Sequence, residues 1–307
     1  MRPSEIVSLR NSLEIMYELH IVSPSLANLY ERLTSPRFRP LLTQENQDTI
    51  VAAAVRYCGQ PAGLCLVEIN EQGQVGIIRS LFVVPHLRTI GLGKELLLFT
   101  EQMLREKGCT KVTIRFVTEE TSTLSIRNLL QRCGWEEPEL YIEENKLDLS
   151  SFSKEKWIYR HHLPPSYKMM AWSQVRPAEL EALKEQNWYP DYASPFMKHP
   201  NSIHLPTSFW LLRREEIVGW AITRENKTDT ILYATLFVKK ELQGTGCGIL
   251  FLAKALQALF MTQIPFLNFI LLHTSDSNSN LIRFSERRLK PFSLNTRKTW
   301  NANKNII

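Results

Sequence analysis

Two short turns in the sequence have the residue types that bind a phosphate group. In each turn a pair of glycines, Gly91 and Gly93 or Gly246 and Gly248, follows a run of apolar and aromatic residues. A helix that begins there would present backbone N–H groups without internal partners, at the positive end of its dipole. Glycine lets such a backbone approach a diphosphate without a Cβ clash. The turns therefore predict two sites for a phosphate-bearing ligand.

The two turns belong to an internal repeat. Residues 81–93 (LFVVPHLRTIGLG) align with residues 236–248 (LFVKKELQGTGCG) at a constant offset of 155 residues, as from 93 to 248. A repeat of that length indicates a duplicated domain and not a solenoid. A chain of 307 residues also suits two domains. Because Pro164 and Pro165 interrupt regular structure near the middle of the chain, we expect one domain at 1–163 and a second at 164–307.

The elements around each turn follow the same order. Alternating and β-branched runs predict strands, and an apolar spacing of three and four residues predicts helices. In the first half the expected strands are 49–57, 62–69, 75–84, 111–117 and a closing strand at 156–161, with helices at 93–107 and 122–132. In the second half they are strands 209–213, 217–223, 231–238 and 266–273, with helices at 248–261 and 279–288. The order β-β-β-α-β-α-β predicts an α/β fold (an α+β mixed sheet) with helices on both faces.

The segment Val83-x-Pro85-x-x-Arg88-x-x-Gly91-x-Gly93 resembles the acyl-CoA signature of the GNAT acyltransferase superfamily. The resemblance covers nearly the whole chain twice and extends to a second, helical motif at 123–135 and 278–290. The first copy has the more complete first motif, whereas the second copy lacks its proline. The resemblance implies two tandem GNAT-like domains, acetyl-CoA or another acyl-CoA as co-substrate, no metal, and a firmer coenzyme site in the first domain.

The resemblance also implies which residues would surround the coenzyme. In the first copy these are Val83, Arg88, Thr89, Gly91, Leu92, Gly93 and Lys94. In the second copy they are Val238, Gln243, Gly244, Gly246, Cys247, Gly248 and Asn278. The backbone N–H of Leu81, or of Leu236, would stabilise the oxyanion that forms when a substrate amine attacks the thioester directly.

Acyl transfer also needs a base for the amine proton and an acid for the leaving thiolate. The family's tyrosine acid falls on Leu130 in the first copy and on Ser285 in the second, and serine is a weak donor. The family's glutamate base falls on apolar residues in both copies. His273 at a strand end is a candidate base, with a structural histidine as the alternative, and Tyr141 is a candidate acid.

Several other residues fit either a structural or a functional role. Glu119 and Glu120 lie at the end of the first-half strand that corresponds to the second-half strand ending at His273. Exposed carboxylates are ordinary at such a strand end. Tyr233 and Thr235 lie on the strand before the second glycine turn, and core packing is the default for the tyrosine. The aromatic segment 187–196 is either a specificity region or plain packing.

Composition narrows the classes of protein. No run of about 20 apolar residues is present, so we expect no membrane span and a cytoplasmic protein. The five cysteines form no C-x2-C pair, which favours free thiols over a metal site. The net charge of +6 includes a basic cluster late in the chain. It could face an acidic carrier protein, but a nucleic-acid partner is disfavoured because no known binding motif accompanies it.

These observations predict an acyl-CoA-dependent N-acyltransferase that acts on an amine of a small molecule or peptide, with acetyl as the default group. One alternative is a fatty-acyl transferase that uses a long-chain acyl-CoA or an acyl carrier protein as donor. A second alternative is a non-catalytic acyl-CoA sensor or scaffold. A transferase that uses aminoacyl-tRNA ranks last, because such doubled proteins generally lack intact coenzyme motifs.

Overall fold

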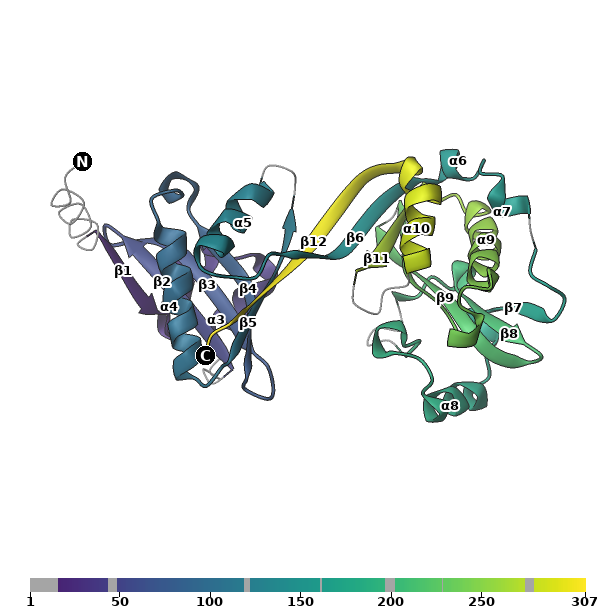
Figure 1. The fold of residues 1–307 in the computed structure, drawn as a ribbon, viewed down its shortest axis with the longest axis horizontal. Helices are drawn as coiled ribbons and strands as arrows, with labels where there is room; N and C mark the ends of the chain where they lie inside the picture. The colour runs from purple at the N-terminus through teal and green to yellow at the C-terminus, as the bar shows by residue number, and fades with distance from the viewer. Residues whose placement is uncertain are drawn as a thin grey trace. The chain divides into compact units, whose positions relative to one another are not determined.

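A computed structural model describes residues 16–43, 49–118, 122–160, 162–196, 202–227, 229–273 and 279–307. The chain divides into two compact units (Figure 1). Unit 1 is Met1–Tyr141 together with Thr299–Ile307, and unit 2 is Ile142–Lys298. Each unit is a mixed α/β structure, which confirms the predicted fold class.

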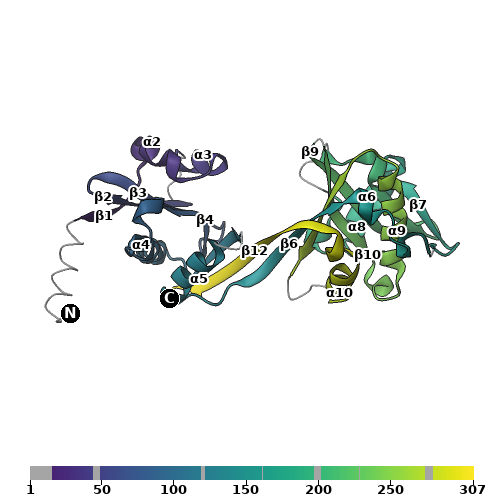
Figure 2. The ribbon, with the colours of Figure 1, turned by 90° about the horizontal axis from the view of Figure 1, so that it is seen from above.

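Unit 1 contains a sheet in the order β1-β2-β3-β4-β5, in which only β4 and β5 are parallel. The strands are β1 (Tyr17–Ile21), β2 (Ile50–Tyr57), β3 (Gln60–Ile69), β4 (Val75–Val83) and β5 (Lys111–Thr118). The short helices α2 (Ala27–Tyr30) and α3 (Arg39–Leu42) cover one face (Figure 2). The longer α4 (Leu92–Glu106) and α5 (Ser122–Arg132) cover the other (Figure 2). An apolar cluster on each face holds these layers together.

Unit 2 repeats this plan in the order β7-β8-β9-β10-β11-β6, with β10 and β11 parallel. Its strands are β7 (Tyr167–Ala171), β8 (Phe209–Arg213), β9 (Glu216–Lys227), β10 (Thr230–Val238) and β11 (Phe266–Leu272), joined by part of β6 (Glu139–Asp148). Helices α9 (Cys247–Phe260) and α10 (Ser279–Arg288) pack on one face. Helix α8 (Pro177–Gln186) packs on the other face, through Leu183 against Trp210 and Trp220.

Most of the predicted helices and strands are present at the expected residues, but the predicted closing strand at 156–161 is wrong. The chain there forms α7 (Trp157–Arg160), after the short helix α6 (Leu149–Phe152). Ile158 is buried, and its carbonyl accepts a hydrogen bond of 2.7 Å from Gln257 Nε2. Trp157 contacts Phe284 edge-on, with ring centroids 5.1 Å apart. These tertiary contacts favour a helical turn over the local strand pattern.

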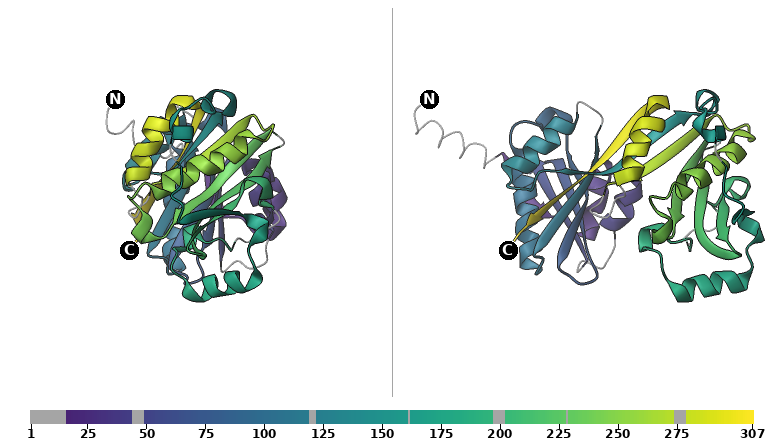
Figure 3. Two further views of the ribbon diagram at one scale, coloured as in Figure 1. Left: turned by 90° about the vertical axis from the view of Figure 1, so that its right-hand side faces the viewer. Right: turned by 45° about the vertical axis from the view of Figure 1, so that its right-hand side comes forward.

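The two units exchange strands along the chain, so their limits differ from the expected boundary at 163/164. Residues 142–148 of β6 pair with β11 in unit 2, although they follow α5 of unit 1 in sequence. The end of the last strand, β12 (Ser293–Asn305), returns to unit 1 as the neighbour of β5 (Figure 3, yellow). There Ala302 and Ile306 are buried in the unit 1 core. The carbonyl of Ala302 accepts a hydrogen bond of 3.2 Å from Thr113 Oγ1.

A buried ion pair fixes this last strand in unit 1. Lys304 Nζ lies 2.5 Å from Glu101 Oε2 and also donates to the Cys133 carbonyl at 2.6 Å. The other oxygen of Glu101, which is 1% exposed, accepts a hydrogen bond of 2.8 Å from Trp135 Nε1. Each oxygen of this α4 carboxylate therefore has a donor, one from β12 and one from the segment after α5.

The cysteines differ sharply in exposure, and this predicts their reactivity. Cys58 is exposed, whereas Cys65, Cys109, Cys133 and Cys247 are buried. Burial raises the pKa of the Cys65 thiol to about 12 and raises the pKa of the other three buried thiols. Because the thiolate is the reactive form, we expect one thiol to react with a disulfide reagent at about pH 8 in the native protein, and all five after denaturation. Native reaction of a second thiol would contradict this pattern.

Candidate functional site

In both units the strand before the glycine turn separates from its parallel neighbour. In unit 2, β10 pairs with β11 only from Thr230 to Tyr233, and its pairing with β9 shifts register between Tyr233 and Thr235. In unit 1, β4 pairs with β5 only from Val75 to Ile78, with a register shift at the corresponding place. Such a bulge bends a strand and ends its pairing. Space therefore opens between the strand ends next to each turn.

The bulge also reverses the alternation of side chains along β10. Tyr233 and Leu236 both face the cluster under α9 and α10, although they are three positions apart and a regular strand would place them on opposite faces. Phe237 faces the opposite cluster, under α8. The space between β10 and β11 is consequently lined from both faces of the unit 2 sheet.

A glycine in the neighbouring strand permits the bent end of β10 to approach closely. A Cβ atom at Gly219 would lie 2.5 Å from the carbonyl oxygen of Phe237. In unit 1 a Cβ atom at Gly63 would lie 2.9 Å from the carbonyl oxygen of Phe82. Both glycines are sequence signals of the bent strand that the pattern analysis missed.

The glycine turns have the backbone conformation that the anion-binding prediction requires. Gly244 and Gly246 have φ of +80° and +84°, and Gly246 immediately precedes α9. In unit 1 Gly91 has φ of +102°, but the position that corresponds to Gly244 is Thr89, with φ of +76°. Threonine is β-branched and disfavours this left-handed region. The unit 2 turn is thus the less strained of the two.

The start of each helix leaves backbone donors available. Within the described part of the chain, the N–H groups of Leu92, Gly93 and Gly248 have no hydrogen-bond partner. The N–H of Cys247, in contrast, donates to Thr245 Oγ1 at 3.3 Å. An anion could accept hydrogen bonds from the unpartnered groups at either helix start.

The side chains of Arg88 and Gln243, expected beside the coenzyme, also hold the turns together. Gln243 Nε2 donates to the Val238 carbonyl at 3.0 Å, and Arg88 Nε donates to the Val83 carbonyl at 2.9 Å. The two bonds are equivalent in the two units. They tie the end of each strand to its turn, and the second N–H of the Gln243 amide stays free to donate to a diphosphate.

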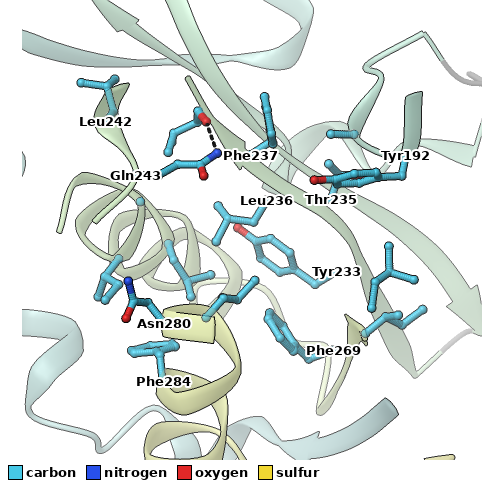
Figure 4. Close-up of a pocket in the computed structure, with 18 of the residues that line it drawn as sticks. Tyr192, Tyr233, Thr235, Leu236, Phe237, Leu242, Gln243, Phe269, Asn280 and Phe284 are labelled. Atoms are coloured by element: carbon cyan, nitrogen blue, oxygen red, sulfur yellow. Dashed lines mark hydrogen bonds between the residues drawn. The ribbon is translucent and has the colours of Figure 1, made fainter. Parts of the chain in front are cut away.

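A cavity of about 510 Å³ lies beside the unit 2 turn (Figure 4). The residues that the sequence had placed around a coenzyme and that line it are Leu236, Val238, Gln243, Gly244, Gly246 and Gly248. The cavity extends between the diverging ends of β10 and β11 to Tyr233 and Phe269. Its size and mostly apolar lining are typical of a small-molecule site.

Further lining residues come from α10 and from the aromatic segment 187–196, which the sequence left open as a specificity region or plain packing. On α10 the lining residues are Asn280, Leu281 and Phe284, and Tyr192 lies near Thr235 on the other side (Figure 4). The helical spacing of 280 and 284 would have found this face. The motif alignment instead placed contacts at 278 and 285.

Several predicted site residues lie away from the cavity. Ser285 is 1% exposed, does not line it, and its Oγ has no partner in the described structure. His273 follows β11 with a buried Nε2 that likewise lacks a partner there, and it is not a lining residue. The side chain of Cys247 is buried elsewhere. Asn278 lies outside the described residues, as do Glu119 and Glu120.

Most of the predicted residues of unit 1 lie at the first turn and on the strand before it, and α5 packs beside the turn. Leu92 is buried in the core, whereas Lys94 is exposed. A Cβ atom at Gly93 would lie 3.6 Å from Leu129 of α5, but one at Gly248 would meet only Val238, at 3.7 Å. Leu81 and Val83 lie on β4 as expected. The Arg115 guanidinium packs over Tyr141, with its Cζ atom 4.1 Å from the centre of the tyrosine ring.

Part of the sequence matches a known protein family. The model of the acetyltransferase (GNAT) family matches residues 13–135, which include the first turn and α5. Residues 13–135 therefore resemble a GNAT acetyltransferase domain. No protein of curated function matches the sequence. The diverging strands and the glycine turn of unit 1 lie within the matched residues, and the same arrangement recurs in unit 2.

Solved structures extend the likeness to both units. A tandem GNAT protein from the clavulanic acid biosynthesis pathway is 13% identical, with a TM-score of 0.61 over 95% of this chain and 99% of that one. A GCN5-related N-acetyltransferase from Sphaerobacter thermophilus is 14% identical, with a TM-score of 0.59 over 94% and 96%. A glucosamine N-acetyltransferase region of a fungal multi-domain protein is 13% identical, with a TM-score of 0.61 over 94% of this chain and 38% of that one. The chain therefore has the tandem GNAT fold.

Among the described helices none is long and apolar enough to cross a membrane. The described residues also contain no group of three or more His, Cys, Asp and Glu side chains placed to hold a metal ion.

Proposed function

We propose that the protein is an N-acyltransferase that takes its acyl group from an acyl-CoA bound in unit 2. The observation that carries this proposal is the cavity of about 510 Å³ that opens directly beside the turn at 244–248. A left-handed glycine turn, an unpartnered helix N–H and a split between parallel strands meet there. Together they suit a ligand with a diphosphate at one end and a long, mostly apolar arm.

Each part of the site would contact a different part of the donor. The N–H of Gly248 would donate a hydrogen bond to the diphosphate, and the positive end of α9 would attract its charge. The arm would lie between β10 and β11, against Leu236 and Val238. Since the cavity is lined from both faces of the sheet, an amine could reach the thioester from the face opposite α9. Its nitrogen would then attack the carbonyl carbon directly, with the Leu236 N–H as oxyanion donor.

A second candidate is a protein that binds acyl-CoA without turnover. It is favoured by the lining of the cavity, because none of the described residues there is Asp, Glu, Lys, Arg or His. Transfer to an alkylamine requires loss of a proton, and a neutral lining supplies no base for it. In the acyltransferase the proton would leave to water or with a base carried by the acceptor.

One experiment separates these functions. Native mass spectrometry of the whole chain with acetyl-CoA and decanoyl-CoA measures binding, and mass analysis of a panel of amines and short peptides measures acyl transfer. The proposed function predicts one bound coenzyme and an acylated amine with release of CoA. Binding without any acylated product would favour the non-catalytic protein. Absence of binding, with transfer from an acyl carrier protein that high salt suppresses, would contradict the acyl-CoA donor.

A further inference from the structure

The tyrosine at the inner end of the unit 2 cavity is placed by the strand geometry. Tyr233 and Phe269 are the last residues paired across β10 and β11 before the strands separate. Their rings lie 6.2 Å apart and close the cavity at this end. Figure 4 shows the Tyr233 hydroxyl pointing away from the strand into the cavity, beside Leu236. A ligand that enters along the diverging strands would meet this hydroxyl at its inner end.

The Tyr233 hydroxyl is buried and has no partner. The residue is 3% exposed, and its Oη has no hydrogen-bond partner in the described part of the chain. Buried hydroxyls are nearly always hydrogen-bonded, since an unmade bond costs free energy. Burial also raises the pKa of Tyr233, so the phenol stays neutral and keeps a proton to donate. An unused donor at the end of a ligand-sized cavity indicates a contact with a ligand atom.

Two other hydroxyls in this unit, those of Ser285 and Tyr192, do not fit that role. Ser285, where the motif placed an acid, is equally buried and unpartnered but does not line the cavity. Tyr192 lines it but is 59% exposed, so water satisfies its hydroxyl. Tyr233 combines burial, lack of a partner and a position at the inner end.

We propose that Tyr233 donates a hydrogen bond to the thioester group of the bound acyl donor. This inference rests on the proposed function and identifies a catalytic residue for it. As the amine nitrogen attacks, a C–N bond forms and the C–S bond breaks, and the electron pair of that bond passes to sulfur. The nitrogen loses its proton, sulfur gains one, and the products are an amide and CoA thiol. Tyr233 keeps its own proton throughout and stabilises the charge that develops on the thioester.

The test compares Tyr233→Phe with Ser285→Ala in the full-length chain. Each substitution removes one buried, unpartnered hydroxyl from unit 2. Because neither hydroxyl has a partner in the free protein, we expect unfolding midpoints no lower than that of the wild type. Tyr233→Phe should weaken acetyl-CoA binding about 10-fold, CoA binding less than about 2-fold, and lower kcat about 10- to 100-fold. Ser285→Ala should change none of these.

The possible outcomes separate the inference from the proposed function. If the wild type binds no acetyl-CoA, the proposed function fails before any variant is compared, and the role of Tyr233 falls with it. If the wild type binds acetyl-CoA and Tyr233→Phe keeps the affinity and kcat of the wild type, the inference alone is overturned. A lower unfolding midpoint of the free Tyr233→Phe variant would also overturn it, because the hydroxyl would then have a structural partner.

Discussion

Replacing Gly248 by glutamate is expected to lower the affinity of the protein for acyl-CoA by about 100-fold or more. Two unit charges about 4 Å apart near a protein surface interact with about 4 kcal/mol, so a carboxylate at the start of α9 would repel the diphosphate strongly. The fold should survive, since a Cβ atom at this position meets only Val238, at 3.7 Å. Glutamate in the first turn of a helix also interacts favourably with the helix dipole.

The matched control is Gly93→Glu, the same substitution at the corresponding position of unit 1. Native mass spectrometry and calorimetry with acetyl-CoA measure both variants against the wild type. Retention of the bound coenzyme in Gly93→Glu and its loss in Gly248→Glu would support a site in unit 2. The reverse result would show that the more complete motif of unit 1 decides binding, and the proposed position of the donor would be wrong.

This comparison matters because the motif and the cavity favour different units. Pro85 and Arg88 give the first turn the more complete signature. A signature records backbone conformation over a short segment, and both turns adopt that conformation. Whether a ligand fits beside the turn depends on the helix packed against it. Leu129 comes close to Gly93 in unit 1, and no α10 side chain is similarly close to Gly248.

The elements around each turn could be predicted because their signals are local. Glycine pairs, alternating apolar runs and helical spacing all lie within segments of the repeat. The exchange of β6 and β12 could not be predicted, because the reason for it lies in contacts distant in sequence. β12 contains mostly polar residues and resembles an exposed segment. In the structure Lys304 meets Glu101, and Ala302 and Ile306 enter the unit 1 core.

The candidate site, too, could be predicted from the sequence only in part. Its glycines and the strand before them followed from the sequence, but the side chains at its inner end did not. The bulge at Ala234 shifts the alternation of β10, so that Tyr233 and Leu236 share a face. A strict alternation would have separated them. On α10 Phe284 lines the cavity and the buried Ser285 does not, which no motif alignment specifies.

Replacing Lys304 by methionine should destabilise unit 1 by about 3–5 kcal/mol, because the substitution leaves the buried Glu101 carboxylate without its cation. Glu101 is 1% exposed, so water cannot substitute for the lost charge. Hydrogen exchange measured by mass spectrometry reports each unit separately. Faster exchange is expected in peptides from α4 and β5, and peptides from α9 and β10 should keep their protection.

The matched control is the double variant Glu101→Gln/Lys304→Met. Its neutral amide still accepts the bond from Trp135 and leaves no uncompensated charge, so most of the lost stability should return. A loss below about 1 kcal/mol for Lys304→Met would equal that of an exposed ion pair and would contradict the anchoring role. Restored protection in the double variant would show that the charge of Glu101, and not the length of the lysine side chain, makes unit 1 depend on the last strand of the chain.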